Sequence, residues 1–395
     1  MTIYKLIATF VRLKRQLKMI IAINARTLRA IPHDGIGWFT HEVVKGIVRA
    51  HPEHRFVLIG DRRHDTPPVV AENVEYVTIP LRTVHPALWQ VWHEVLLPPV
   101  LNKCGAGLFV APDGIIPLHT DVPCISVIHD LNHEHRPDDI PGRERRYFRK
   151  MFPRFASKAV RVATVSEYSA EDISATYGIE KNKIDVVSNG VADTFSPSHP
   201  MDAEETRREY TGGRPYFLFV SNFSPRKNVG TVIKAFEIFR DRDHGDHVLL
   251  LAGRRLYLTH ETDRVIRSSR YASDIILTGS LTRDELRRLY GAAAALTFVP
   301  WFEGFGIPVV EAQRCGTPCI LSDTSSLPEV SGGAALCVSP ADAGAVADAM
   351  AQLVSDEALR RRLSQEGIKN SLRYSWENAS EQMWNSITKA MNNIP

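Results

Sequence analysis

Short runs of apolar residues alternate along the chain with longer segments whose apolar positions recur at helical spacing. The first run covers residues 20–24, and a helical pattern follows at 38–50. Later runs in this half predict strands at 55–59, 107–111, 124–129, 162–165 and 183–188. Short apolar strands separated by helices are typical of a parallel sheet that is covered on both faces.

The same alternation starts again after a polar stretch at residues 196–214. That stretch contains Pro197, Pro200, Gly212 and Gly213, and we expect it to be a linker. Beyond it the pattern predicts strands at 216–221, 247–252, 275–278, 295–299, 318–322 and 335–338, with helices at 230–240, 283–291, 341–356 and 357–370. Two such series predict an α/β protein with two facing, doubly wound domains. Ligands of such sheets bind at the carboxyl ends of the strands, so the cleft between the domains is the expected site.

Composition excludes several classes of function and leaves the predicted fold unchanged. The 395 residues are 44% hydrophobic and 24% charged, which suits a globular protein with one or two cores. The formal net charge of +3 is too small to indicate nucleic-acid binding. The five cysteines form no metal-ligand pattern, and we expect reduced thiols in a cytoplasmic protein. No apolar run is long enough to cross a membrane, so we expect no transmembrane helix.

Residues 1–18 form a segment of unusual character. They include five basic residues and no acidic one, and their apolar residues recur at helical spacing. This pattern favours a basic amphipathic helix lying on an anionic membrane surface, on the inner face of the cytoplasmic membrane. Two alternatives stay open, namely an ordinary docking helix and translation that starts at Met19, directly before the first strand.

The strongest candidate for chemistry is the segment 303–311, Glu-Gly-Phe-Gly-Ile-Pro-Val-Val-Glu, which follows the strand predicted at 295–299. Pro308 suits the first turn of a helix, and Gly304 and Gly306 leave backbone N–H groups uncovered just before it. Such a helix end attracts phosphate groups. The alternative is a glycine-rich turn that carries two solvated glutamates.

A second candidate follows the strand predicted at 216–221. Arg226 and Lys227 are adjacent there, and together they can neutralise a diphosphate. A leaving nucleoside diphosphate needs such stabilisation as its charge develops. The alternative is a basic surface loop.

Two further loops follow predicted strands. His129 ends the strand at 124–129, where it can bind a sugar or phosphate or transfer a proton. The spacing of His129, His133 and His135 fits no familiar zinc pattern, and we expect no metal. Gly35 and Gly37 lack the third glycine of a dinucleotide motif, but their loop can approach a diphosphate or an acceptor.

In this order, the motifs resemble those of family 4 glycosyltransferases, which have the two-domain GT-B fold. The resemblance extends over nearly the whole chain from about Met19, and two further motifs, residues 188–191 and 375–379, strengthen it. It implies three regions after the basic amphipathic segment 1–18. These are an acceptor-binding domain at 19–195, a nucleotide-sugar-binding domain at 196–375 and a helix at 376–395 that crosses back to the first domain.

The resemblance also implies roles for individual residues. Glu303 would bind hydroxyls of the donor sugar, Arg226 and Lys227 would hold the diphosphate, and His129 would contact the sugar and its phosphate. These four would be the catalytic residues, and Glu311 would bind the ribose. The donor site as a whole would comprise Gly35, Gly37, Asn222, Gly253, Arg254, Gly279, Gly304, Phe305, Gly306 and Glu311.

The expected activity is therefore hexosyl transfer from a nucleotide sugar to a saccharide or lipid-linked saccharide, with retention of configuration and without a metal. The sequence around Phe302 looks most like mannosyl- and rhamnosyltransferases of bacterial surface polysaccharides such as O-antigen, which favours GDP-mannose or a related deoxyhexose donor. Two alternatives are a nucleotide-sugar 2-epimerase and a non-catalytic carbohydrate-binding protein of the same fold. The second predicts loss of the charged residues, all of which are present.

Overall fold

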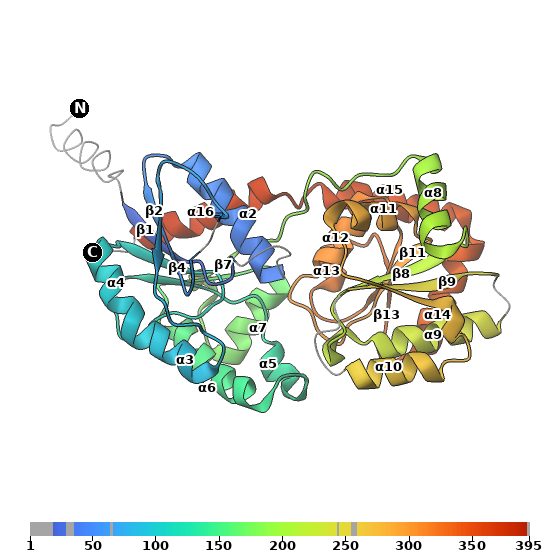
Figure 1. The fold of residues 1–395 in the computed structure, drawn as a ribbon, viewed down its shortest axis with the longest axis horizontal. Coiled ribbons are helices and arrows are strands. Elements are labelled where there is room, and N and C mark those ends of the chain that lie inside the picture. Colours follow the sequence, from blue (N-terminus) through green and yellow to red (C-terminus); the bar gives the residue numbers. More distant parts are fainter. Residues whose placement is uncertain (1–18, 29–34, 64–65, 243–244, 254–258, 393–395) are drawn as a thin grey trace.

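The computed structural model describes residues 19–28, 35–63, 66–242, 245–253 and 259–392, and contains two parallel sheets side by side along its long axis (Figure 1). The first sheet has the order β3-β2-β1-β4-β5-β6-β7. Its strands are β1 (Ile20–Asn24), β2 (Arg55–Gly60), β3 (Val74–Thr78), β4 (Leu108–Ala111), β5 (Cys124–Val127), β6 (Arg161–Thr164) and β7 (Ile184–Val186). The second has the order β10-β9-β8-β11-β12-β13. Its strands are β8 (Tyr216–Val220), β9 (Val248–Ala252), β10 (Ile275–Gly279), β11 (Ala295–Phe298), β12 (Cys319–Ser322) and β13 (Leu336–Val338).

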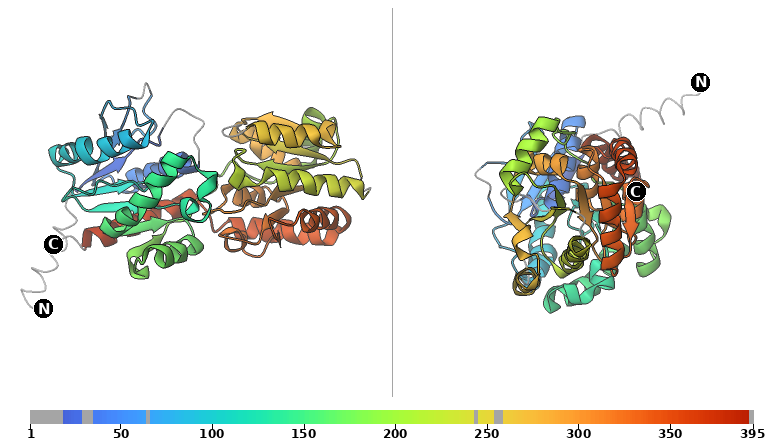
Figure 2. Two further views of the ribbon diagram at one scale, coloured as in Figure 1. Left: turned by 90° about the horizontal axis from the view of Figure 1, so that it is seen from below. Right: turned by 90° about the vertical axis from the view of Figure 1, so that its right-hand side faces the viewer.

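Helices connect the strands and cover both faces of each sheet (Figures 1 and 2). Those of the first half are α2 (Gly35–Ala50), α3 (Pro86–Val91), α4 (Leu97–Cys104), α5 (Asn132–His135), α6 (Gly142–Lys158) and α7 (Glu167–Tyr177). Those that follow are α8 (Pro200–Thr211), α9 (Val229–Asp241), α10 (Thr259–Ser268), α11 (Arg283–Ala292), α12 (Ile307–Arg314), α13 (Leu327–Ser331), α14 (Ala343–Ser355), α15 (Glu357–Ser371) and α16 (Trp376–Asn392). The doubly wound fold predicted from the sequence is confirmed.

Each sheet reverses its strand order at a central strand. β1 pairs with both β2 and β4, and β8 pairs with both β9 and β11. All these pairs are parallel, and the central strands are almost wholly buried because helices lie on both sides of them. The point where strand order reverses leaves a crevice at the carboxyl ends of the strands. Each half therefore has a crevice at the carboxyl ends of its central strands, where a ligand can bind.

The polar stretch 196–214 was expected to be a linker, and this expectation is wrong for most of its length. It contains α8, which packs against α11. Pro200 lies in the first turn of α8, where its missing N–H leaves no bond unmade, and Gly212 ends the helix at φ 65°. Pro200 and Gly212, which had suggested a linker, thus mark the two ends of a helix.

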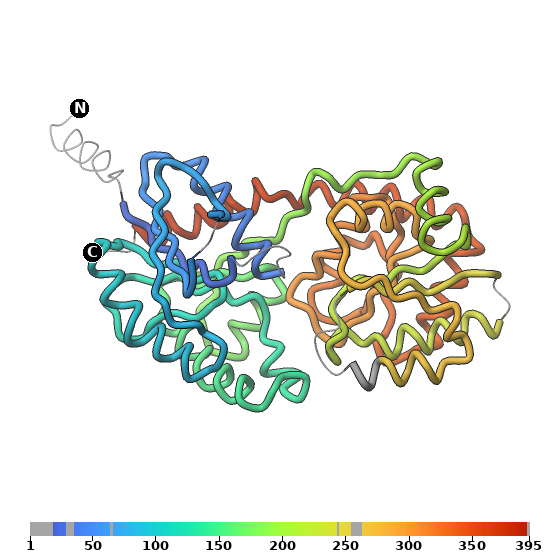
Figure 3. The backbone as a smooth tube through the Cα atoms, in the orientation of Figure 1, coloured from blue at the N-terminus to red at the C-terminus, as the bar shows by residue number. Residues whose placement is uncertain are grey.

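The last helix, α16, leaves the second half and lies against the first (Figure 3). It packs along α2, where a Cβ placed on Gly46 would lie 2.1 Å from Oγ of Ser380. At the edge of the sheet, Gln382 accepts a 2.9 Å hydrogen bond from the backbone N–H of Ser188, and Lys389 donates a 2.6 Å hydrogen bond to Asp185. The first half thus contains both early and final residues of the chain.

Within the described part of the chain, no helix has the length and apolar character needed to cross a bilayer. Residues 1–18, for which the sequence predicts a membrane-surface helix, lie outside that part.

Candidate active site

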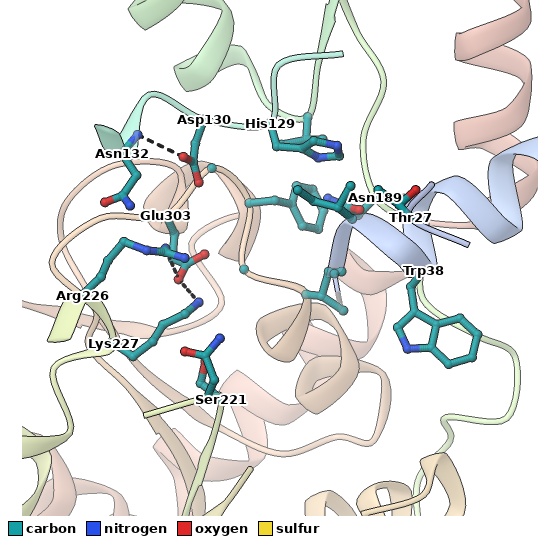
Figure 4. Close-up of a pocket in the computed structure, with 18 of the residues that line it drawn as sticks. Thr27, Trp38, His129, Asp130, Asn132, Asn189, Ser221, Arg226, Lys227 and Glu303 are labelled. Carbon is teal, nitrogen blue, oxygen red and sulfur yellow. Dashed lines mark hydrogen bonds and ion pairs between the residues drawn. The ribbon is translucent and has the colours of Figure 1, made fainter. Parts of the chain in front are cut away.

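A cavity of about 770 Å³ lies between the two halves of the molecule. Its lining comes mainly from loops at the carboxyl ends of strands, including those after β1 and β5 on one side and after β8, β9 and β11 on the other. Figure 4 shows side chains from both halves around it: Asp130 points toward Arg226 and Glu303, whereas the ring of His129 lies on the side of Asn189.

Three charged side chains meet in the second-half wall of this cavity. Nη1 of Arg226 donates a 2.7 Å hydrogen bond to Oε1 of Glu303, and the ammonium of Lys227 donates to the same oxygen. Arg226 also donates to the carbonyl of Phe302 at 2.6 Å. Side-chain exposure is 18% for Arg226, 10% for Lys227 and 9% for Glu303, so water contributes little to their solvation.

The backbone that carries the two cations is held firmly. Arg226 and Lys227 belong to a short 3-10 turn after β8, and Asn228 follows in the left-handed conformation at φ 58°. The side-chain amide of Asn228 donates to the carbonyls of Val299 and Pro340, at 2.9 and 2.8 Å. This side chain therefore ties the turn to the end of β11, beside the loop that carries Glu303.

The electrostatics of this trio favour an anionic ligand. Burial and the adjacent charge of Arg226 lower the pKa of Lys227. Burial alone would also lower the pKa of Arg226, but the Glu303 carboxylate and the charges of Asp130 and Asp139 together outweigh it, and the pKa is raised. Within the second-half wall two cations share one carboxylate, which leaves an excess of positive charge there, while Asp130 of the opposite wall also acts on both cations. A diphosphate would relieve the mutual repulsion of the cations.

The glycines before α12 serve close packing. A Cβ on Gly304 would lie 2.2 Å from the carbonyl oxygen of His129, so only a glycine allows this approach between the two halves. The carbonyl of Gly304 accepts hydrogen bonds from the hydroxyls of Ser166 at 2.7 Å and Ser169 at 3.3 Å. Gly306, at φ 92°, directly precedes α12. Gly304, Phe305 and Gly306 also line the cavity.

Glu329 joins the halves a short distance away. Its carboxylate accepts hydrogen bonds from the backbone N–H groups of Glu167 and Tyr168, at 2.9 and 2.8 Å. These are the first two residues of α7, so a residue of α13 in the second half caps a helix of the first. The hydroxyls of Ser166 and Ser169, which donate to the Gly304 carbonyl, also join the two halves. We call Ser166, Ser169 and Glu329 the interdomain latch.

Glu311 lies one turn into α12 and lines the cavity. It accepts a 3.0 Å hydrogen bond from the hydroxyl of Tyr290. Burial raises the pKa of Glu311 to about 7, because the bond from Tyr290 and the charge of Arg283 compensate only in part. The carboxyl group therefore lacks a firm cationic partner in this structure.

His129 is fixed at the end of β5. Its Nε2 donates a 2.8 Å hydrogen bond to the carbonyl of Pro112, and its ring packs edge to face on Phe39 at 5.0 Å. The nearby His133 and His135 bond to Tyr177 and Asp172, away from one another. Among the described residues, no group of three or more His, Cys, Asp or Glu side chains could hold a metal ion.

Of the other residues predicted for the donor site, some line the cavity and some do not. Gly35, Asn222 and Gly253 line the cavity, whereas Gly37 and Gly279 do not. Gly35 and Gly37 were expected in a loop, but they form the first turn of α2, which begins three residues earlier than predicted. The prediction for Arg254 falls outside the described residues. Gly279 instead accepts the backbone hydrogen bond of Gly253 at 2.9 Å.

Some residues of the cleft were not singled out from the sequence. Trp38 lies under the guanidinium of Arg283, 3.4 Å from the ring centre, and so links α2 to α11 across the cleft. Asp113 and Ser166 closely follow the predicted strands at 107–111 and 162–165. A polar residue just after a predicted strand was the signal used for His129, and it would have found these two as well.

Comparisons with known proteins agree with this architecture. A family model described as Glycosyltransferase Family 4 matches residues 33–195, and one described as Glycosyl transferases group 1 matches residues 202–370. The chain is 25% identical over 280 residues to the O-antigen chain mannosyltransferase B of Escherichia coli, covering 71% of this chain and 73% of that protein.

Solved structures share the fold at lower identity. Sucrose-phosphate synthase from Thermosynechococcus elongatus matches with a TM-score of 0.78 at 17% identity, covering 95% of this chain and 100% of that one. Anabaena HepE in complex with UDP and glucose matches with a TM-score of 0.72 at 16% identity, covering 94% of this chain and 99% of that one.

Proposed function

Because this chain belongs to the group 1 and family 4 glycosyltransferases, with the GT-B fold, we propose that it transfers a hexose from a nucleotide-sugar donor to a saccharide or lipid-linked saccharide. The observation that carries the proposal is the trio of Arg226, Lys227 and Glu303 in the wall of the cleft. Mannose or a related deoxyhexose is the proposed sugar, and O-antigen or another surface polysaccharide is the proposed product class. The similarity to an O-antigen mannosyltransferase supports both.

The trio suggests how the donor would be held. Arg226 and Lys227 would turn to the diphosphate, which becomes more negative as the bond to the sugar breaks. Glu303 would then exchange its two cationic partners for hydroxyls of the donor sugar. Through these hydrogen bonds its carboxylate would position the sugar and would not act as a nucleophile. Glu311 would accept hydrogen bonds from the ribose.

Transfer is proposed to proceed on one face of the sugar. The bond between the anomeric carbon and the phosphate oxygen breaks, and a bond to the acceptor oxygen forms on the same side. The acceptor's proton passes to the departing phosphate oxygen. Nε2 of His129 donates to the Pro112 carbonyl, so Nδ1 of the neutral ring is an acceptor that suits a hydroxyl of the donor sugar.

The positive charge of Arg226 and Lys227 also supports a proposal that transfer requires no metal ion. Activity measured after EDTA treatment and gel filtration should equal that of the untreated protein. A loss of activity that Mg²⁺ or Mn²⁺ restores would overturn the proposal.

The central experiment identifies the donor. Thermal shift is measured with GDP-, UDP-, dTDP- and ADP-sugars, and each stabilising sugar is then incubated with methyl α-mannoside as acceptor. GDP-mannose is expected to stabilise the protein most, and NMR should show an α-linked product from the α-linked donor. Stabilisation by none of the four, or a β-linked product, would contradict the proposed function or its retention.

The two alternative functions would give different results in the same assay. A nucleotide-sugar 2-epimerase would convert the donor without any acceptor, which NMR of the donor alone would detect. A non-catalytic carbohydrate-binding protein would leave the donor intact under all conditions. We expect transfer only in the presence of acceptor, apart from slow hydrolysis of the donor.

Peripheral membrane binding through residues 1–18 is a separate proposal, supported by the basic amphipathic pattern of that segment. The chain from Met19 onward should bind vesicles containing phosphatidylglycerol more weakly than the full chain does. Equal sedimentation of both forms with those vesicles would refute this role.

A further inference from the structure

We propose that the first-half wall of the cleft contains an acceptor subsite in which the Asp113 carboxylate, held by Arg26, binds hydroxyls of a neutral sugar. The proposal rests on the proposed function, because it concerns where the acceptor sits in the same cleft. It assigns the class of the acceptor's reacting end, a neutral saccharide, and the residues that recognise it.

Asp113 is held in place by three groups of its own half. Arg26, just after β1, donates a 2.6 Å hydrogen bond to Oδ2 through Nη2. The amide of Asn24 donates to both carboxylate oxygens at 3.0 and 3.1 Å, and the backbone N–H of Ile115 donates at 3.3 Å. Arg26 and Asp113 both line the cavity, with side-chain exposures of 7% and 10%. The carboxylate is thus a fixed acceptor of hydrogen bonds at the surface of the cavity.

The position of Asp113 ties it to the reaction centre. Pro112, its neighbour in the chain, provides the carbonyl that accepts the hydrogen bond of His129. The loop after β4 therefore carries both the anchor of His129 and the Asp113 carboxylate. Asp130, the residue after His129, points toward Arg226 and Glu303 (Figure 4). A sugar bound at Asp113 would lie on the wall across from the proposed diphosphate site.

An aromatic surface completes this part of the cavity. Trp89 and Phe148 stack nearly parallel, with ring centres 5.6 Å apart and an angle of 13° between the rings, and both line the cavity. The indole N–H of Trp89 donates to the carbonyl of Thr83 at 2.8 Å, which fixes the ring. Aromatic walls with a few fixed polar groups are the usual lining of small-ligand pockets. They suit the apolar faces of a sugar ring.

The charges here point to a neutral ligand. Arg26 and Asp113 compensate each other, and burial together with the charge of Arg26 lowers the pKa of the adjacent His93 to about 3, so this ring carries no charge near pH 7. Burial also lowers the pKa of His133, another residue of this wall. A phosphorylated or acidic sugar would need a cation that is not already committed to a carboxylate. A neutral hexose needs only hydrogen-bond partners.

A second buried ion pair in the same half has a structural role and serves for comparison. Arg161 and Asp185 meet at 2.6 Å with exposures of 10% and 8%, close to the values for Arg26 and Asp113. Asp185 also bonds to Ser386 and Lys389 of α16, and it borders a groove between α7, β7 and α16 rather than the cleft. The Arg161–Asp185 pair is therefore a matched control with a similar burial and no access to the proposed acceptor.

The test compares Asp113→Asn with Asp185→Asn. KM and kcat are measured with methyl α-mannoside at saturating donor, together with donor hydrolysis in the absence of acceptor and calorimetric affinity for the donor's nucleoside diphosphate. We expect Asp113→Asn to raise the acceptor KM or lower kcat/KM on the order of 10-fold or more, since a hydrogen bond to a charged group is lost. Donor hydrolysis and nucleotide affinity should stay within about 2-fold of the wild type. Asp185→Asn should lower thermal stability without changing the acceptor KM.

Two further measurements keep the proposal falsifiable. Trp89→Leu removes the aromatic surface while leaving the charged pair, and it should weaken the use of methyl α-mannoside in the same way if Asp113→Asn does not fold. Methyl α-glucuronide, which carries a carboxylate, should be a poor acceptor for the wild type. An unchanged acceptor KM together with an unchanged kcat/KM in both variants, or a preference for the glucuronide, would overturn the subsite. A wild type that neither binds nor hydrolyses any nucleotide sugar would instead overturn the proposed function.

Discussion

The ammonium of Lys227 donates to the same carboxylate oxygen of Glu303 that accepts from Arg226, so one carboxylate holds two buried cations in the wall of the cleft. The carboxylate keeps the cations in place before any ligand arrives. A diphosphate that takes over both cations would leave Glu303 without its partners, in a position to accept hydrogen bonds from sugar hydroxyls. Binding of the two ends of the donor is therefore coupled.

Replacing Lys227 tests the diphosphate role directly. Lys227→Ala should lower kcat by on the order of 10²-fold or more, because it removes charge stabilisation from the transition state. Lys234→Ala, an exposed lysine on the neighbouring helix α9, should leave kcat unchanged. Initial rates of transfer under saturating donor provide the measurement. Near-normal turnover of a folded Lys227→Ala protein would count against the assigned role.

The coupling through Glu303 predicts opposite effects on catalysis and product binding. Glu303→Gln should lower kcat on the order of 10-fold or more, because a charged partner of the sugar is lost. The same change frees Arg226 and Lys227 from competition with a carboxylate, so the affinity for the free nucleoside diphosphate should rise. Calorimetry and steady-state kinetics measure the two effects. A parallel fall in kcat and in nucleotide affinity would contradict the coupling.

Glu311 should contribute to nucleotide recognition. Glu311→Ala removes the proposed acceptor for the ribose hydroxyls and should weaken the binding of the nucleoside diphosphate. The expected decrease in affinity is on the order of 10-fold, as for other hydrogen bonds to charged groups. Glu357→Ala, at an exposed position on α15, is the matched control. Unchanged affinity in calorimetry would refute the ribose contact.

The raised pKa of Glu311 also predicts a pH dependence of stability. The folded protein binds a proton at Glu311 up to about pH 7, whereas the unfolded chain releases it near the ordinary value of 4.5. The contribution of Glu311 to stability therefore falls as pH rises between these values. In Glu311→Gln this dependence is absent, so the variant should gain in Tm relative to the wild type between pH 5 and pH 8. A constant difference in Tm over that range would show that the pKa is not raised.

The interdomain latch predicts a defect in closure rather than in nucleotide binding. Glu329→Ala leaves the first N–H groups of α7 without their partner across the cleft. We expect a lower kcat and a larger radius of gyration by small-angle scattering, with nucleotide affinity within about 2-fold because the cap lies outside the proposed diphosphate site. Glu366→Ala, on the surface of α15, should change none of these. A normal kcat with an unchanged radius of gyration would rule out the latch.

Strands were predicted from the sequence far better than surface helices were. Buried strands such as β8 are continuous apolar runs because both faces are covered, and their positions could be found within a residue or two. β3 was missed, since it is an edge strand whose side chains are mostly half exposed. Helix α6 was missed because it is rich in arginine and contains Pro153, which argues against a helix when only local pattern is used.

Candidate residues of the site were predicted by type and by place after a strand, while their partners were not. Arg226, Lys227 and Glu303 were each expected at the cleft. Their joint hydrogen bonding could not be derived, because it depends on how two loops separated by more than 70 residues pack together. Gly304 shows the same limit, since its close approach to His129 involves two different sheets and leaves no pattern in the local sequence.

The crossing of α16 has a consequence for how the protein emerges from the ribosome. α2 is among the first of the described helices to be synthesised, and its surface around Gly46 packs against α16, the last helix that the structure describes. The first half therefore cannot complete its packing until α16 has been synthesised, which happens after the whole second half. During synthesis the surface of α2 that packs against α16 stays uncovered until then, which makes it a point for chaperone contact and for aggregation of truncated chains.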